Sequence, residues 1–175
     1  MPSDKQLAYN KDIILSCLIF CLCGMIISMA FFYEWKGYLP CELCYKERIS
    51  YYITLIIMPI IIILQILKKN RICYFIFIFL IFIFLVNSGL SIYHLGVEQK
   101  IFSGPEDCSG IIKKTSDINI FYEQLKTVKV VRCDSPNLWI FGLSLANWNI
   151  FMSLLIAFIA FKATNLHRYQ SRAGS

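Results

Sequence analysis

Four long stretches of the chain contain no charged residue, and shorter polar segments separate them. They run from 13 to 33, 49 to 67, 72 to 95 and about 138 to 161. Each reaches the roughly 20 apolar residues that a helix needs to cross a bilayer core. Only helices and closed barrels satisfy their backbones in lipid, and unbroken apolar runs exclude the alternating pattern of barrel strands. The pattern predicts an all-α membrane protein with four transmembrane helices, in a single domain over residues 1–175.

Composition strengthens this prediction. The chain is 58% hydrophobic and 15% aromatic, which is well above the apolar share of soluble domains. A soluble protein would have to cover four lipid-like surfaces. Lys5 and Lys11 form a basic start that is similar to a signal peptide, but the apolar stretch after them exceeds the usual h-region of about 7–15 residues. We therefore expect a retained membrane anchor.

Lysine and arginine predict the orientation in the membrane. The N-terminus, the link at 68–71 and the C-terminal tail are short and basic, whereas acids balance the cations of the long loop at about 96–137. Short basic loops face the cytoplasm. We therefore expect cytoplasmic termini, with a short first and a long second loop on the outer side. The net charge of +6 then reflects topology and indicates no nucleic-acid partner.

The predicted topology sorts the eight cysteines into two groups. Four lie inside spans, where free cysteine behaves as a small apolar residue: Cys17, Cys21, Cys23 and Cys73. The other four lie on the outer side or at its edge, where disulfides persist: Cys41, Cys44, Cys108 and Cys133.

Three interpretations of the outer cysteines are open. A four-thiolate zinc site is one, although such sites usually have two close pairs, and 24 residues separate Cys108 from Cys133. Inert disulfides are another, but closing the short loop between Cys41 and Cys44 would add little stability. A Cys-x-x-Cys pair is more typical of redox chemistry.

The surroundings of the close pair favour reactivity. Pro40 precedes it and the second span follows, so Cys44 should lie in the first turn of a helix. The partial positive charge of a helix N-terminus stabilises a thiolate. Arg48 lies on the same face one turn further, where it could hold a thiolate or a ligand carbonyl, or extend to lipid headgroups. We expect Glu47 to pair with Arg48 or Lys46 rather than to handle protons.

Three segments resemble the disulfide bond formation protein B (DsbB) family. "LPCELCYKERISYY" (39–52) resembles the Pro-Cys-x-Leu-Cys signature that opens the second helix of the family. "GLSIYHLGVEQKIFSGPEDCSG" (89–110) is similar to the third helix running into the second outer loop. "VRCDSPNLWIFGLSLANWN" (131–149) resembles the return into the fourth helix. The resemblance covers nearly the whole chain.

The resemblance implies a multi-pass protein of the bacterial inner membrane that acts as a dithiol:quinone oxidoreductase, with both loops periplasmic. Cys108 and Cys133 would form a loop disulfide. A reduced DsbA-like partner with a thioredoxin fold would attack Cys108, and the electrons would pass to a Cys41–Cys44 disulfide. Cys44 would then reduce a membrane quinone, ubiquinone rather than menaquinone, held beside Arg48. Such a relay through quinone keeps the bacterial periplasm oxidising.

Other residues enter as candidates for quinone binding. Glu47, His94 near the outer end of the third span, and Trp148 complete the expected cofactor site with Arg48. Trp148 also fits an interfacial aromatic belt. We expect no metal ligand in the redox interpretation. Two alternatives remain: a four-span binding protein with an outer four-cysteine zinc site, and a redox protein of the vitamin K epoxide reductase type. In the latter type the Cys-x-x-Cys lies on a later helix.

Overall fold

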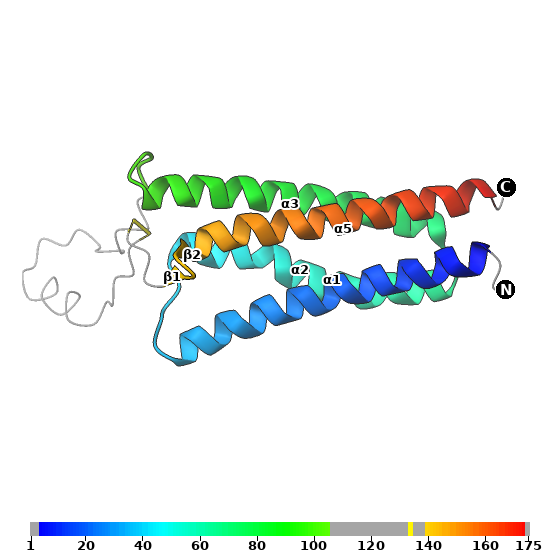
Figure 1. The fold of residues 1–175 in the computed structure, drawn as a ribbon, viewed down its shortest axis with the longest axis horizontal. Coiled ribbons are helices and arrows are strands. Elements are labelled where there is room, and N and C mark those ends of the chain that lie inside the picture. The colour runs from blue at the N-terminus through cyan, green and yellow to red at the C-terminus, as the bar shows by residue number, and fades with distance from the viewer. Residues whose placement is uncertain (1–3, 106–132, 135–138, 174–175) are drawn as a thin grey trace, which may run out of the picture.

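The computed structural model describes residues 4–105, 133–134 and 139–173, with side chains from residue 10 to residue 168 of these ranges. Four long helices make up most of it (Figure 1): α1 (Asp4–Trp35), α2 (Glu42–Ile66), α3 (Asn70–Glu98) and α5 (Leu145–Ala173). Each contains a segment long and apolar enough to cross a membrane. The predicted four-helix membrane fold is therefore confirmed.

The helices do not start where the apolar runs start: α1 begins at Asp4 and α3 at Asn70, both ahead of their runs. Helix α2 begins at Glu42, ahead of the apolar run at 49 because its first turn carries charged residues, and Cys44 lies in that first turn as expected. Helix α5 begins at Leu145, after the predicted 138, because a hairpin precedes it. Strands β1 (Trp139–Ile140) and β2 (Leu143–Ser144) pair antiparallel. Apolar composition alone could not separate this hairpin from the helix that follows.

The hairpin has a local cause in its two turn residues. Phe141 and Gly142 have φ angles of 53° and 77°, and positive φ at both central positions is the signature of a type I′ turn. Glycine adopts this conformation without steric cost. The Trp148 indole Nε1–H donates to the Ile140 carbonyl at 3.0 Å and so ties the hairpin to the first turn of α5.

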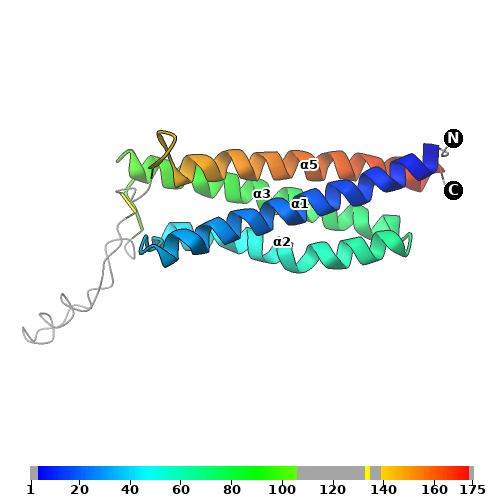
Figure 2. The ribbon, with the colours of Figure 1, turned by 60° about the horizontal axis from the view of Figure 1, so that its bottom comes forward.

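The helices alternate in direction. In Figures 1 and 2 the N- and C-terminal ends lie together at one end of the bundle. The connection between α1 and α2 and the hairpin lie at the other end. Helix α5 packs most extensively on α3, and α1 contacts both α2 and α5. This arrangement brings the head of α2, the last turns of α3 and the start of α5 to the same end.

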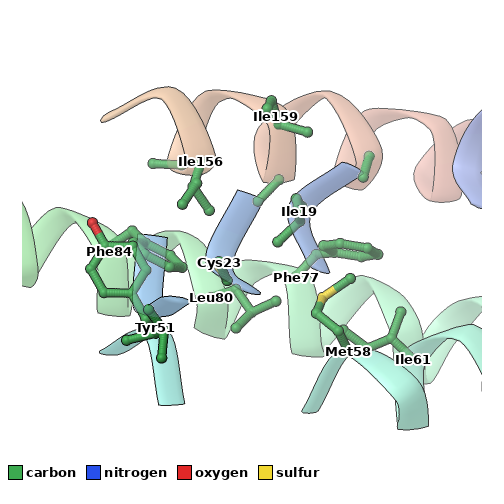
Figure 3. Close-up of a cluster of buried hydrophobic side chains, with 14 residues drawn as sticks. Ile19, Cys23, Tyr51, Met58, Ile61, Phe77, Leu80, Phe84, Ile156 and Ile159 are labelled. Carbon is green, nitrogen blue, oxygen red and sulfur yellow. The ribbon is translucent and has the colours of Figure 1, made fainter. Parts of the chain in front are cut away.

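A continuous apolar core runs between the four helices (Figure 3). Ile19, Met58 and Phe77 are fully buried in it, and Tyr51 meets Phe84 edge to face with 5.4 Å between ring centroids. Large apolar side chains also cover the outer faces of the helices. An apolar outer surface of this extent is unfavourable in water and suits contact with lipid.

A buried polar cluster joins three helices near the terminal end of the bundle. Gln65 of α2 donates from Nε2 to Ser16 Oγ of α1 at 2.9 Å, and its Nε2 lies 3.1 Å from His167 Nε2 of α5. Asp12 Oδ2 lies 3.8 Å from His167 Nδ1. Interhelical polar contacts in membranes contribute about 0.6–2 kcal/mol each, so this cluster aligns the helix ends that lie farthest from the cysteine pair.

The span cysteines have free thiols, as the sequence predicts. Cys23 and Cys73 are buried between helices, whereas Cys17 and Cys21 are exposed on α1. The buried pair fills space in the core, as a small apolar residue does.

Candidate functional site

Cys41 caps the N-terminus of α2. Its backbone is extended, with φ −77° and ψ 171°, and its Sγ accepts the Cys44 backbone N–H at 3.3 Å. The Cys41 sulfur therefore takes the position of a capping oxygen, where the free N–H groups of the helix favour negative charge. The pair of cysteines is thus built into the start of the helix.

The two cysteines of the pair are in contact without a disulfide bond between them. Their Sγ atoms lie 2.9 Å apart and share a hydrogen bond, whereas a disulfide would bring them to about 2.05 Å. The structure describes the reduced form of the pair. A resting Cys41–Cys44 disulfide stays a prediction.

Cys41 carries the stabilised thiolate of the pair. The hydrogen bond from the Cys44 thiol lowers the pKa of Cys41 well below its usual value, with further contributions from His94 and the Cys44 backbone N–H, and these outweigh the effect of burial. The sequence predicts the helix N-terminal stabilisation at Cys44 instead. That prediction was wrong for the reduced pair, because the capping position belongs to the residue before the first turn.

His94 links α3 to the dithiol. Its Nε2 lies 3.5 Å from Cys41 Sγ, and its Nδ1 lies 2.9 Å from Glu47 Oε1. Both His94 and Glu47 are almost fully buried. A histidine whose Nδ1 faces a carboxylate presents its other nitrogen to the sulfur, so Glu47 fixes the orientation of the ring.

The predicted ion pair of Glu47 with Arg48 or Lys46 was wrong. Glu47 faces the bundle interior towards His94, while Lys46 lies on the exposed side, 3.5 Å from Glu42. Successive helical residues point about 100° apart, so neighbouring charges on α2 face different surroundings. Sequence adjacency could not indicate this, because the histidine comes from another helix.

Arg48 instead pairs with Glu34. Its guanidinium Nη1 donates to Glu34 Oε1 near the end of α1, and both side chains are largely buried. Sequence reasoning missed this residue. The available signal was an acid at the outer end of an otherwise apolar span, where a cationic partner is to be expected.

One cavity joins the predicted site residues. It has a volume of about 370 Å³, and its lining includes every predicted site residue that the structure describes: Cys41, Cys44, Glu47, Arg48, His94, Cys133 and Trp148. Most of the remaining lining is apolar, with Met25, Met29 and Met152 among it. Cys108 lies outside the described residues.

Cys133 reaches this cavity from the long loop. It is disulfide-bonded and 2% exposed, and it packs in one cluster with Cys41, Leu43 and Val97. A sulfur held in a disulfide cannot serve as a thiolate ligand of zinc. The structure therefore argues against the four-thiolate zinc site and brings a disulfide next to the dithiol.

Polar side chains continue from the cavity into the bundle. Ser91 Oγ of α3 donates to the Asn87 carbonyl at 2.9 Å and accepts from Asn149 Nδ2 of α5 at 2.7 Å. The Tyr51 hydroxyl donates to Asn149 Oδ1 and lies 3.3 Å from Ser153 Oγ. Tyr51 and Asn149 also line the cavity. This network, which sequence reasoning missed, holds α2, α3 and α5 together beside the site.

Comparison with known proteins shows the family to which the chain belongs. The family model of the disulfide bond formation protein DsbB matches residues 11–163. "Uncharacterized protein RP370" of Rickettsia prowazekii (strain Madrid E) is 25% identical over 150 residues, covering 82% of each chain. No solved structure matches the chain significantly. Because the family match includes the four membrane helices and the Cys-x-x-Cys at the head of α2, the chain belongs to the DsbB family of disulfide bond formation proteins.

Proposed function

We propose that this protein is a dithiol:quinone oxidoreductase that reoxidises a DsbA-like periplasmic partner and passes the electrons to membrane quinone. The observation that carries the proposal is the shared cavity. It brings Cys133 of the long loop, the dithiol of α2 and Arg48 together among apolar side chains. Membership of the DsbB family supports disulfide formation in general.

The cavity fits a quinone ring. Ligand sites of about 300–1,000 Å³ are mostly apolar with a few placed polar groups, and this cavity has about 370 Å³ with an apolar lining. Arg48 uses Nη1 for Glu34, which leaves further N–H donors of its guanidinium fork for a carbonyl oxygen. Trp148 offers a flat face and His94 a ring nitrogen. A bound quinone, which we expect to be ubiquinone rather than menaquinone, supplies an acceptor for two electrons and two protons.

The relay begins at the loop disulfide. A thiolate of the reduced partner bonds to Cys108, which breaks the Cys108–Cys133 bond and leaves Cys133 as a thiolate. Cys133 packs in one cluster with Cys41, so we expect it to attack that sulfur in an oxidised Cys41–Cys44 pair and release Cys44. The second thiol of the partner then resolves the mixed disulfide, and the partner leaves oxidised.

The loop disulfide is then restored. Cys108, freed from the partner, attacks Cys133 and displaces Cys41. Thiol–disulfide exchange is faster when the leaving thiol has a low pKa, and the lowered pKa of Cys41 makes it a suitable leaving group. The two electrons of the partner now reside on the Cys41–Cys44 dithiol. No further oxidant is needed until the quinone step.

The dithiol and its neighbours serve the quinone step. Cys44 would deliver the electron pair and so re-form its bond to Cys41, because it lies one turn from Arg48 on α2. Glu47 and His94 form a hydrogen-bonded pair beside the sulfurs, so they can take up protons from the dithiol and pass them to the quinone oxygens. The net change converts two partner thiols and one quinone into one disulfide and one quinol.

Quinone reduction by the detergent-purified full chain tests the proposal. With a reduced DsbA-like protein as electron donor, we expect the chain to reduce quinone. The loss of quinone absorbance measures this turnover. Cys44→Ser should abolish it, and Cys108→Ser should prevent the partner mixed disulfide. Cys73→Ser replaces a buried thiol elsewhere in the bundle, so this control variant should retain turnover. Wild-type rates in the Cys44→Ser variant would overturn the proposal.

A further inference from the structure

We propose that the reduced Cys41–Cys44 pair and His94 form a binding site for a thiophilic divalent cation, Zn²⁺ in the cell, and that the oxidised pair cannot bind it. This site differs from the four-cysteine zinc site considered from the sequence, because it uses His94 and needs neither loop cysteine. Binding of the ion requires only the reduced pair and His94, so it does not depend on which final electron acceptor the protein uses.

The donor atoms are already grouped. Cys41 Sγ, Cys44 Sγ and one ring nitrogen of His94 all lie within 4.8 Å of one another, and His94 Nε2 is 3.5 Å from Cys41 Sγ. Two cysteines and one histidine with a remaining open position form a known zinc ligand set. These three side chains come from the head of α2 and the last turns of α3, so rigid helices hold them.

The histidine is oriented as a metal ligand. Histidines that bind metal usually donate their other ring N–H to a carboxylate. Glu47 Oε1 lies 2.9 Å from His94 Nδ1 and fills this role, so the Nε2 that faces Cys41 binds the ion once its proton has left. Glu98 Oε1 lies 3.8 Å from the same Nε2 and is near enough to share the fourth position with water.

The site needs only a small adjustment to accept the ion. Zn–S bonds of about 2.3 Å in a tetrahedron place two sulfurs roughly 3.7 Å apart, whereas the dithiol sulfurs lie 2.9 Å apart. Rotation of the half-buried Cys44 side chain about χ1 can supply the difference of less than about 1 Å. Both sulfurs bind the ion as thiolates and His94 Nε2 binds it as a lone pair, so the Cys44 S–H proton and any proton shared by Cys41 and His94 leave as the bonds to Zn²⁺ form. No electron is transferred, so the step requires no oxidant.

Redox state decides whether the ligands exist. In a disulfide both sulfurs are bonded to each other and neither is a thiolate, so the metal would select the reduced pair. A bound ion would in turn hold both thiolates and keep them from exchange. Zn²⁺ would therefore act as an inhibitor that traps the reduced protein.

The test measures metal binding directly. The detergent-purified full chain carries serine at the cysteines that could bind metal elsewhere: Cys17, Cys21, Cys108 and Cys133. Cd²⁺ is added first, because its thiolate complexes absorb in the ultraviolet, and Zn²⁺ then displaces it. We expect one ion per reduced chain and none after the remaining pair is oxidised.

Substitutions at the three ligands and at Glu47 show whether these side chains hold the ion. Cys44→Ser should abolish binding, and Glu47→Gln, which disturbs only the orientation of His94, should weaken it about 10–100-fold. His94→Gln should weaken it at least as much, while Cys73→Ser should leave it unchanged. Equal binding by oxidised chains, no binding by reduced chains, or an unchanged affinity in both the His94 and Glu47 variants would overturn the inference. Quinone turnover without zinc binding would refute this inference alone, and zinc binding without quinone turnover would refute only the proposed function.

Discussion

Arg48 has a planar fork of five N–H donors, and Glu34 occupies one of its nitrogens. Arg48→Ala should raise the apparent KM for quinone and slow turnover, because one charge-assisted hydrogen bond contributes roughly 1.5–3 kcal/mol, or about tenfold or more. Arg48→Lys should rescue only in part, since lysine keeps the charge and loses the fork. Steady-state quinone reduction at varied quinone concentration measures both effects.

The partner step provides the control for Arg48. Trapping of the Cys108 mixed disulfide should stay near normal in Arg48→Ala, because the guanidinium lies on α2 and not on the loop. Glu34→Gln retains an acceptor oxygen for Arg48, so it should affect the quinone step less than Arg48→Ala does. If Arg48→Ala leaves quinone kinetics unchanged, Arg48 is an interfacial anchor only.

Cys41 should ionise at unusually low pH in the reduced protein. Its pKa is lowered in the fold, so at neutral pH the folded chain carries a thiolate where the unfolded chain carries a thiol. The resulting stabilisation of the reduced fold is complete at pH values above the pKa of Cys41 in the unfolded chain. It is lost as the pH falls through the lower pKa of Cys41 in the folded chain. The difference in thiolate absorbance between wild type and Cys41→Ser, titrated with pH, should show this shifted midpoint.

Removing the hydrogen-bond donors of Cys41 gives the contrasting case. Cys44→Ala deletes the thiol that contributes most to lowering the pKa, and His94→Gln deletes the next side chain. Both should move the Cys41 midpoint upward, the first by more. A wild-type midpoint near the ordinary cysteine value of about 8.5 would contradict the capping role described for Cys41.

At the scale of the elements, the end of α3 depends on a close approach at Gly96. The Gly96 carbonyl accepts the N–H groups of Ile101 and Phe102 at 2.8 and 3.2 Å, and a Cβ added at Gly96 would lie 2.3 Å from Phe102 Cδ2. The Phe102 ring stacks on Tyr93 with 5.8 Å between centroids. The chain therefore folds back over the helix end just before the long loop.

Gly96→Ala should destabilise the protein by about 0.5–1.5 kcal/mol, the value of an aromatic contact, because the half-exposed Phe102 ring must move away. Gly89 is a matched control on the same helix, where an added Cβ meets open space. Gly89→Ala should be neutral or stabilising by about 0.5–1 kcal/mol. Thermal unfolding in detergent compares them. Equal melting temperatures for the two variants would exclude this role of Gly96.

For the whole molecule, the expected orientation places both termini in the cytoplasm. Both ends of the chain lie at one end of the bundle, opposite the hairpin, and the short link 68–71 carries three cations. Short basic loops remain cytoplasmic. An alkaline phosphatase fusion, which is active only when exported, should be inactive at Asn70 and active at Lys114.

The same fusions can refute the orientation. An exported Asn70 fusion together with a cytoplasmic Lys114 fusion would place the long loop inside the cell. The relay with a periplasmic partner would then be impossible, because Cys108 could not meet it. Fusions at both sites that report the same side would contradict a single membrane crossing by α3, which separates them in the chain.

Local patterns in the sequence were sufficient for the helices and for the position of the dithiol. An apolar run of about 20 residues has few stable alternatives to a helix in lipid, because backbone groups find no water there. The spacing of Cys41 and Cys44 and the charged residues after them likewise place the pair at the head of α2. The helix boundaries were harder to predict. Before α5 the chain turns at Phe141 and Gly142 because of their backbone conformation, and the sequence there stays apolar.

Only the tertiary structure decided which side chains meet. His94 lies 53 residues from Cys41, Glu34 meets Arg48 from another helix, and Cys133 packs beside the dithiol from the far side of the long loop. Helical periodicity defines the face on which a residue lies, but the rotation and vertical alignment of neighbouring helices define its partner. These depend on the packing of the whole core, which is why Glu47 faces His94 and not the cations adjacent to it in the chain.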